Sequence, residues 1–387
     1  MSLEFGVFDH IEHLPGIGLE QLYDERLITL EMLDRHGFYG YHLAEHHTPA
    51  VHSMAPSQNV FLAAVAQRTE RLRFGPCVYV LPLHHPLRLI EEISMLDNIS
   101  HGRMEIGVGR GGVLEAYFWG QDSDPETNQA RYDETLAIVR QGLSHEALTY
   151  HGRFWEFEEV PMRLRPKQTP YPPLWYMRNP EIAAREGMNC IVVGGLDRFE
   201  ANVVRYKRLW NQYQGEGALT PQGSEPKMGL VTHIVVADTD AEAQEAAKPA
   251  WEAYRWNLGT PRRLEAERRQ LTQFLDRRDS GDAQQGSTPV RHLAVEERRD
   301  LEAALEELSE GKKKDRKERR LNPGGLGAGA VAGSPDTVRR YMNEYAECGA
   351  NYFVCSFQWG NLSHEHACRS IELFAEEIMP AFVAEHA

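Results

Sequence analysis

Short apolar runs alternate with amphipathic stretches along almost the whole chain, and this alternation limits the folds that the sequence can form. The runs are rich in valine, isoleucine and aromatic residues, which favour strands. They lie at residues 3–8, 40–44, 72–82, 104–111, 172–177, 189–195, 228–238 and 351–357. Helix-compatible segments follow them, as at 20–36, 58–68 and 87–99. Eight strands separated by helices predict an α/β fold in which a parallel sheet closes into a (β/α)8 TIM barrel.

A doubly wound open sheet is the alternative interpretation of the same alternation. Such a sheet normally carries a glycine-rich dinucleotide-binding turn after its first strand. Here the first strand leads into FGVFDHIEHLPG, which lacks that pattern. The chain has 387 residues, which is long for one domain but within the range of a barrel with insertions. We therefore expect one barrel domain over residues 1–387.

The overall charge argues against a polyanionic partner. The chain has 57 acidic and 42 basic residues and a formal net charge of −15, whereas nucleic-acid-binding domains present a cationic face. Its five cysteines are scattered, which is typical of reduced thiols rather than of a disulfide framework. The N-terminus lacks the pattern of a signal peptide, and no apolar run reaches the roughly 20 residues that span a bilayer. We expect a cytoplasmic protein without a nucleic-acid or membrane partner.

One segment, 259–332, interrupts the alternation after the seventh strand. It is highly charged, contains GKKKDRKERR at 311–320 and runs into NPGGLGAGAVAG. Its composition is typical of a solvated insertion within the barrel domain. Because it follows a strand end, where barrel active sites lie, it can instead form a lid over the site. Both interpretations stay open.

Polar residues and glycines gather where the predicted strands end, which is the face of a barrel that carries the active site. They are Glu45, His46 and His47 after the second strand, Arg110 after the fourth, and Arg178 and Asn179 after the fifth. A guanidinium between glycines can bind phosphate oxygens with paired hydrogen bonds. The turn from Met177 to Asn179 opens a helix whose first amides can bind the same phosphate. Arg110 is thus a candidate phosphate ligand, with a surface salt bridge as the alternative.

The histidines of YHLAEHHTPAVHS raise the question of a metal site, but the spacing does not match one. Metal-dependent barrel hydrolases use an HxH pair after the first strand, whereas this chain has His10-Ile11-Glu12-His13 and no HExxH. We expect no metal. An acid–base or hydrogen-bonding function of one histidine is favoured, because imidazole titrates near neutrality. His84 and His85 are interpreted as loop and packing residues.

Several segments, in matching order, resemble the bacterial luciferase-like flavin monooxygenases. They are LAEHHTP, VLPLHHPLRLIEEISMLDNISHGRMEIGVGRG, GSPDTV and SIELFAEEIMP. The resemblance covers most of the chain, and only the charged segment has no clear counterpart. It implies a (β/α)8 barrel that binds FMN, reduced by a separate flavin reductase, together with molecular oxygen. It further implies that a C4a-hydroperoxyflavin oxygenates a small or medium organic substrate, and that the protein is a homodimer.

The resemblance also assigns individual residues. His46 matches a histidine near the reactive edge of the flavin and is expected to assist proton transfer, with Glu45 beside it as a cofactor contact. Arg110 matches the arginine that binds the flavin phosphate. Cys77–Val78 matches a non-prolyl cis peptide beneath the flavin ring, and Trp251 matches an aromatic residue of the flavin pocket.

The chain departs from that family at two turns. The turn after the fifth strand is shortened to MRNPEIAA, so Met177, Arg178 and Asn179 are expected to contact the cofactor and its phosphate. Gly194-Gly195 replaces a bulky aromatic residue after the sixth strand, so the pocket differs in shape and light emission is not expected. Two alternatives remain: an oxidoreductase of the same fold that uses the deazaflavin F420, and a flavin-binding subunit without activity.

Overall fold

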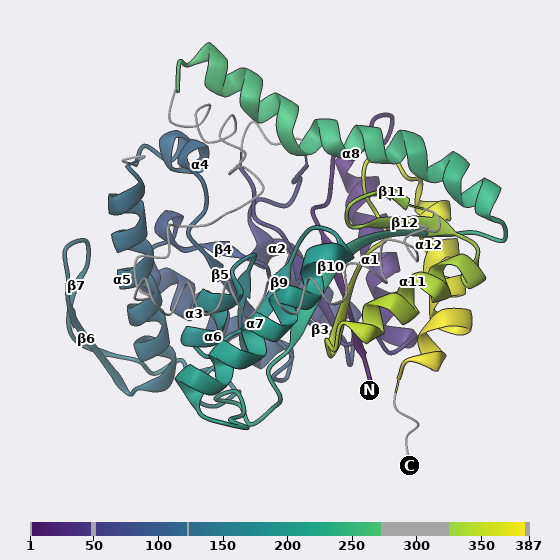
Figure 1. Cartoon of the computed structure of the whole chain (residues 1–387). Coiled ribbons are helices and arrows are strands. Elements are labelled where there is room, and N and C mark those ends of the chain that lie inside the picture. Colours follow the sequence, from purple (N-terminus) through teal and green to yellow (C-terminus); the bar gives the residue numbers. More distant parts are fainter. Residues whose placement is uncertain (1, 48–51, 122–123, 272–324, 384–387) are drawn as a thin grey trace, which may run out of the picture.

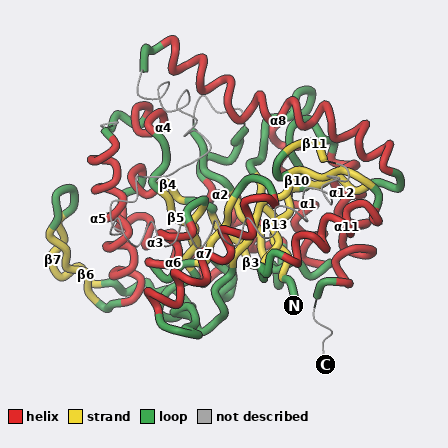
Figure 2. The backbone as a smooth tube through the Cα atoms, viewed as in Figure 1, coloured by secondary structure: helices red, strands yellow, loops and turns green. Residues whose placement is uncertain are grey.

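A central parallel barrel dominates the computed structural model of the chain, which describes residues 2–47, 52–121, 124–271 and 325–383. Its strands are β1 (Glu4–Asp9), β2 (Gly40–Leu43), β3 (Arg73–Pro76), β4 (Tyr79–Val80), β5 (Ile106–Gly109), β8 (Leu174–Met177), β9 (Asn189–Val192), β10 (Met228–Val236) and β13 (Tyr352–Ser356). They follow one another in the order β3-β2-β1-β13-β10-β9-β8-β5-β4. Figure 2 shows these strands at the centre, with helices around them. The predicted α/β barrel is confirmed.

The seam between β3 and β5 closes the barrel. β3 and β4 are two parts of the predicted strand 72–82, which is interrupted at Cys77–Val78. β4 pairs with β5 directly, and β3 reaches the same neighbour through a bridge between Phe74 and Met104. Glycine at position 75 is required here, because a Cβ there would lie 2.0 Å from the backbone oxygen of Glu105. The nine short strands therefore occupy eight positions around the barrel.

Helices cover the outside of the barrel (Figure 1). They are α1 (Leu19–Arg35), α2 (Gln58–Arg68), α3 (Pro86–Ile99), α4 (Val113–Phe118), α5 (Pro125–Ser144), α6 (Pro180–Arg185), α7 (Leu196–Gln214), α8 (Asp240–Arg268), α11 (Pro335–Glu347) and α12 (His364–Leu373). Short turns of helix lie at η1 (Leu81–Leu83), η3 (Phe374–Ile378) and η4 (Met379–Ala381). Within the described ranges, no helix has the length and apolar character needed to span a membrane.

Two hairpins were not predicted. β6 (Ala147–His151) pairs with β7 (Glu156–Pro161) and projects from the side of the barrel (Figure 1). β11 (Gly325–Gly327) pairs with β12 (Ala330–Gly333). β12 also pairs in parallel with the C-terminal half of β10. The first hairpin is half exposed and polar, and the second is mostly glycine and alanine. Neither has the long apolar run by which a buried barrel strand is recognised.

The charged segment 259–332 meets described elements at both ends. Residues 259–268 continue α8, which begins with a capping box between Thr239 and Glu242. High charge does not end this helix, because arginine and glutamate are good helix formers on an exposed face. Residues 325–332 belong to the β11–β12 hairpin. Residues 272–324, which include the basic run, lie outside the described residues, so the insertion and lid interpretations remain predictions.

A buried polar network stabilises the interior near the seam. The carboxylate of Glu105, which is only 2% exposed, accepts hydrogen bonds from Tyr39 (2.5 Å), Arg73 (2.6 Å) and the indole N–H of Trp175. Tyr39 precedes β2, Arg73 begins β3 and Trp175 belongs to β8. One side chain thus holds together segments from three positions of the barrel.

Candidate active site

Side chains that follow three strands lie at the carboxyl end of the barrel, the face expected to carry the site. His10 follows β1, His46 follows β2 and Arg178 follows β8. The rings of His10 and His46 stack with their centroids 5.5 Å apart. His52, from the connection after β2, lies with its ring 4.3 Å from that of His46. We call this region the barrel mouth.

His46 is linked to a carboxylate and through it to a guanidinium. Its Nδ1 lies 3.7 Å from Oε1 of Glu115 on α4, and the same carboxylate forms an ion pair with Arg262 on α8. Burial by itself would raise the pKa of Glu115, but Arg262 and His46 outweigh it and hold that pKa well below its usual value. Glu115 is therefore a carboxylate at neutral pH. The side chain of His46 is 23% exposed, so a ligand in the mouth can reach it.

The imidazoles of the mouth are neutral at physiological pH. Burial lowers the pKa of His46 in spite of the opposing effect of Glu115. Burial likewise lowers the pKa of His10, that of His52 to about 2 and that of His233 on β10 to about 4. Neutral imidazoles can accept or donate a proton without first losing a charge. His46 therefore has the ionisation state that a base or hydrogen-bond acceptor requires.

Glu45 holds the loop after β2 in place rather than facing the mouth. Its Oε1 lies 2.7 Å from Nε2 of His47, and its Oε2 accepts the backbone N–H of Val80 at 2.9 Å. His84 approaches the same carboxylate at 3.0 Å. His46 and His47 consequently point to different partners, as expected for adjacent residues. His84 is more than a packing residue, because its bond to Glu45 fixes the loop.

These bonds predict how the free energy of unfolding depends on pH. Burial would raise the pKa of Glu45, but His84 and His47 lower it to about 2. A depressed carboxyl pKa stabilises the fold above the unfolded value of about 4.3, and the gain is lost as the pH falls towards 2. We expect Glu45→Gln to lower the free energy of unfolding by about 2–3 kcal/mol at pH 6 and by about half as much at pH 3. Urea unfolding at both pH values checks this, and an equal loss at both would contradict it.

The expected cis peptide is present between Cys77 and Val78. Strand β5 passes close to it, because a Cβ at Gly107 would lie 2.8 Å from the Cα of Cys77. A Cβ at Gly109 would likewise lie 2.5 Å from Cγ2 of Val78. Cys77 and Val78 pack in one apolar cluster with Met177 from β8. This cluster forms an apolar floor in the interior of the barrel.

Arg110 and Arg178 follow neighbouring strands, since β5 pairs with β8 in parallel. The backbone oxygen of Arg110 accepts a hydrogen bond from Asn128 of α5 at 3.2 Å. Burial raises the pKa of Tyr176 to about 12. The positive charge of Arg110 acts against this rise. Tyr176 packs outward against Tyr132, also of α5. Arg110 therefore belongs to the side of the barrel that faces α5.

Asn179 has a local structural function. Its side-chain oxygen accepts the backbone N–H groups of Glu181 at 3.0 Å and Ile182 at 3.1 Å, so it caps α6. Two of the amides that we expected to bind a phosphate are thus already used by the chain itself. Capping by asparagine is common because its oxygen satisfies amides that have no partner in the first turn.

Trp251 lies in an aromatic cluster beside the mouth. Its ring stacks on Tyr254 with centroids 5.5 Å apart and meets His233 edge-on at 5.3 Å. A Cβ at Gly327 would lie 3.1 Å from its Nε1, so the β11–β12 hairpin closely approaches it. Trp251 therefore packs between α8, β10 and the β11–β12 hairpin, and these three elements border the mouth on one side.

Helix α8 runs across the carboxyl end of the barrel (Figure 1) and is attached to it at two points of the mouth. Asn257 donates to Oε2 of Glu12 at 2.8 Å, and Arg262 forms the ion pair with Glu115. The backbone N–H of Gly360 donates to Oε1 of Glu12 at 2.9 Å. Burial raises the pKa of Glu12, with these bonds opposing the rise.

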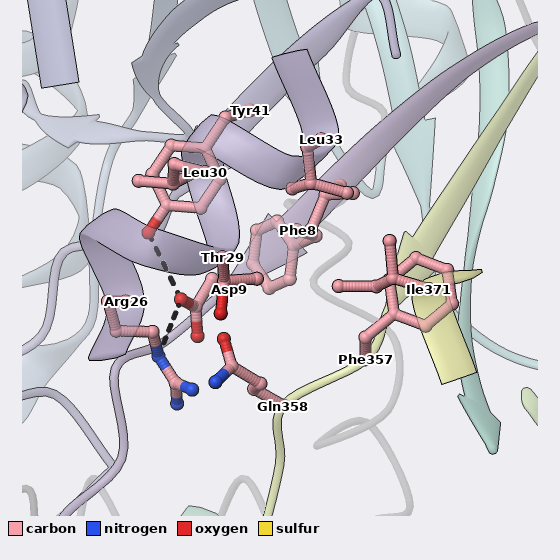
Figure 3. Close-up of a pocket in the computed structure, with 11 residues that line it drawn as sticks. Phe8, Asp9, Arg26, Thr29, Leu30, Leu33, Tyr41, Phe357, Gln358 and Ile371 are labelled. Carbon is pink, nitrogen blue, oxygen red and sulfur yellow. Dashed lines mark hydrogen bonds and ion pairs between the residues drawn. The ribbon is translucent and has the colours of Figure 1, made fainter. Parts of the chain in front are cut away.

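A small cavity with a mostly apolar lining lies beside the turn after β1 (Figure 3). Asp9 accepts bonds from Tyr41 at 3.1 Å and from the backbone N–H of Ile11 at 2.9 Å, and pairs with Arg26 at 3.0 Å. These bonds hold Ile11 at a left-handed φ of 51°, in the turn that carries His10. The cavity is lined by Val7, Phe8, Asp9, Arg26, Thr29, Leu30, Leu33, Tyr41, Phe357, Gln358 and Ile371.

Sequence reasoning missed most of the surroundings of His46. His10 was considered only for metal spacing, and His52 was left without a function. Glu115 and Arg262 lie far apart in the chain and carry no local motif that would mark them as a pair. Among the described residues, no group of histidine, cysteine and carboxylate side chains is arranged to hold a metal.

Sequence comparison identifies relatives over most of the chain. A family model described as luciferase-like monooxygenase matches residues 3–352. An uncharacterised protein of Sinorhizobium fredii is 41% identical over 262 residues, which are 66% of this chain and 73% of that protein. The oxygenase component of a flavin-dependent trigonelline monooxygenase from Acinetobacter baylyi is 29% identical over 253 residues, 63% of this chain and 68% of that protein.

Solved structures share the fold at lower identity. The oxygenating constituent of 3,6-diketocamphane monooxygenase from Pseudomonas putida, in complex with FMN, has a TM-score of 0.68 at 18% identity and covers 100% of both chains. The coenzyme F420-dependent tetrahydromethanopterin reductase of Methanopyrus kandleri has a TM-score of 0.62 at 19% identity, over 99% of this chain and 100% of that one. The match of the family model to residues 3–352 confirms the resemblance, and the chain is an enzyme of the luciferase-like monooxygenase family.

Proposed function

We propose that the protein is a monooxygenase that uses reduced FMN and molecular oxygen to oxygenate a small or medium organic substrate. The observation that carries the proposal is the link from His46 to Glu115 and Arg262 at the mouth, beside the apolar floor of Cys77, Val78 and Met177. The relative from Acinetobacter baylyi is the oxygenase component of a flavin-dependent enzyme, which supports a separate reductase as the source of reduced flavin.

The residues of the mouth fit a flavin. Val193, at the end of β9, is 43% exposed, and a Cβ at Gly194 would meet no atom within 4 Å, so open apolar space lies there. Among the described residues, Nε2 of His233 and Oε2 of Glu115 are buried without a hydrogen-bond partner. An unsatisfied buried polar atom is costly unless a ligand or water completes it. Apolar space with a few polar groups is typical of a cofactor site.

Individual residues then take distinct functions. Bound reduced FMN would supply the electrons that activate oxygen. Arg110 binds its phosphate from the α5 side, and Cys77–Val78, Met177 and Trp251 flank its ring system. His46 accepts or returns a proton at Nε2, since Nδ1 faces Glu115. Glu45 and Asn179 are proposed to support this site indirectly, through the loop after β2 and the start of α6.

Stopped-flow absorbance tests this function. Protein is mixed with FMNH2 without oxygen and then with oxygenated buffer. We expect a transient absorbing species that differs from both reduced and oxidised FMN and whose decay depends on added substrate. Conversion to oxidised FMN at the rate of free flavin would contradict the proposal. That outcome would favour F420 chemistry, for which the Methanopyrus kandleri enzyme provides a fold precedent, or a flavin-binding subunit without activity.

The phosphate ligand can be tested separately. We expect Arg110→Gln to weaken FMN binding by at least about tenfold, because a charged hydrogen bond contributes about 1.5–3 kcal/mol. Binding of riboflavin, which has no phosphate, should hardly change. Fluorescence titration with both flavins measures the two affinities. Equal losses for FMN and riboflavin would contradict a phosphate contact.

We also propose that the protein is a homodimer. Apolar side chains are exposed on neighbouring helices, namely Val60 on α2 (75% exposed) and Met95 on α3 (52%), and a dimer would cover them. Light scattering that gives a monomer mass at micromolar concentration would contradict this.

A further inference from the structure

The half of α8 that crosses the barrel mouth is held mainly by polar contacts. The first half of the helix packs on the barrel through three alanines that are 0% exposed, namely Ala243, Ala247 and Ala250. In the described residues of α8 beyond position 254, the only buried residue is Ala266. This half has little apolar packing, so the bonds made by Asn257 and Arg262 fix its position over the mouth.

Arg262 holds the carboxylate of Glu115 from one side, and the start of α4 confines it from the other. The ion pair joins Nη2 of Arg262 to Oε1 of Glu115. Gly112 precedes α4, and a Cβ there would lie 2.7 Å from Oε2 of Glu115 and 3.7 Å from Nη2 of Arg262. Among the described residues, Oε2 of Glu115 has no hydrogen-bond partner. The ion pair with Arg262 therefore decides where this carboxylate points.

Glu115 in turn lies against one particular nitrogen of His46. Its Oε1 is 3.7 Å from Nδ1, and its side chain is only 6% exposed. A carboxylate beside a neutral imidazole favours the tautomer with the hydrogen on the nearer nitrogen, because the negative charge attracts an N–H and repels a lone pair. The lone pair of His46 is then on Nε2. This tautomer is maintained as long as Arg262 keeps the carboxylate in place.

We propose that Arg262 is a positioning residue, which holds Glu115 against Nδ1 of His46 and so keeps the proton-accepting lone pair on Nε2. The inference rests on the proposed function, in which Nε2 exchanges the proton. Arg262 belongs to α8 and Glu115 to α4, whereas His46 follows β2. The tautomer of the base consequently depends on the docking of α8, a helix that takes no part in the proton transfer.

The tautomer is measured directly, in protein without flavin. Nitrogen-15 NMR of histidine-labelled protein distinguishes a ring nitrogen that carries a hydrogen from one that does not. The signals of His46 are identified by their loss in His46→Asn. We expect hydrogen on Nδ1 in the wild type and a shift of the population towards hydrogen on Nε2 in Arg262→Met. Methionine keeps most of the length of the side chain and removes its charge.

Three further variants make this test specific to Arg262. Arg263→Met removes the next arginine of α8, which pairs with Glu267 at 3.7 Å and is 46% exposed, and it should change neither the tautomer nor turnover. Arg262→Lys keeps the charge and should restore most of the tautomer of the wild type. Arg262→Gln is measured in parallel, so that the test does not depend on one folded variant.

The outcomes that overturn the inference follow from these variants. One is an unchanged tautomer in Arg262→Met or Arg262→Gln, with an unfolding midpoint that shows a folded protein. A second is the same change of tautomer in Arg263→Met. A third is an Arg262→Lys variant that behaves like Arg262→Met, because the charge would then not be the cause.

Turnover separates a positioning function from a merely structural one. We expect Arg262→Met to lower kcat by about 10–100-fold, the usual cost of losing a group that orients a functional histidine, and to change KM by less than about twofold. In a Glu115→Gln background the same substitution should cost less than about twofold, because the two residues act as one unit. Additive losses would overturn the inference. Failure of the proposed function is distinguishable: the wild type then forms no transient species with FMNH2, while the tautomer in flavin-free protein still depends on Arg262.

Discussion

Turnover is expected to fall by about 10²–10⁴-fold when His46 is replaced by asparagine, while FMN binding stays close to that of the wild type. The reason is that Nδ1 of His46 faces the carboxylate of Glu115, so Nε2 is the atom that exchanges a proton with the reacting groups. Asparagine keeps a polar side chain but does not titrate. Product formation is measured with FMNH2 from a reductase, using the substrate identified from the decay of the transient species.

Two variants act as controls for His46. His52→Asn changes a ring only 4.3 Å away, and it should cost less than about tenfold, because His52 has no carboxylate partner among the described residues. Glu115→Gln should give an intermediate loss. It removes a group that raises the pKa of His46, so the acid limb of the rate–pH profile should move to lower pH. Undiminished turnover in His46→Asn, or equal losses in His52→Asn, would refute the assignment.

The largest loss of stability is expected for Glu105→Ala. We expect the free energy of unfolding to fall by about 3–5 kcal/mol, the usual cost of removing one partner of a buried ionic network. Three donors from Tyr39, Arg73 and Trp175 would lose their acceptor at the barrel seam. Each donor left unsatisfied in the interior costs about 1–3 kcal/mol. Urea unfolding of the two proteins at pH 7 gives the difference.

Glu105→Gln provides the matched comparison for this variant. Glutamine is of similar size and keeps one acceptor oxygen, so it should destabilise the fold less than alanine does. The double variant Glu105→Ala with Arg73→Met should recover part of the loss, because it removes the charge that Glu105 neutralises. A loss below about 1 kcal/mol in Glu105→Ala would show that the network contributes little.

The barrel strands could be predicted because most are buried on both faces. β10 is buried at every position from Met228 to Val236, and such strands read as continuous apolar runs. The two hairpins lack that signal, since β7 alternates between half-buried and exposed residues. High charge in segment 259–332 concealed the last turns of α8, because an exposed helix needs few apolar residues.

The candidate active site could be predicted only where its residues lie close together in the sequence. The segment around Glu45 and His46 drew attention because titratable residues follow a strand end. The pairing of Glu115 with Arg262 depends on α8 crossing the mouth, and no spacing in the sequence encodes it. The turn from Met177 to Asn179 was predicted as one phosphate site. Its two polar residues differ, because Asn179 caps α6 whereas the side chain of Arg178 is exposed.

For the proposed FMN cofactor, the neutrality of the mouth histidines has a consequence for the rate of uptake. The chain has a net charge of −15, so an anionic flavin is repelled by the molecule as a whole. At physiological ionic strength this repulsion is screened beyond about 8 Å, and only the arginines nearest to the opening act on the phosphate. Uptake therefore depends on short-range capture and not on long-range attraction. Removing salt extends the repulsion and slows uptake, which is opposite to the behaviour of electrostatically steered association.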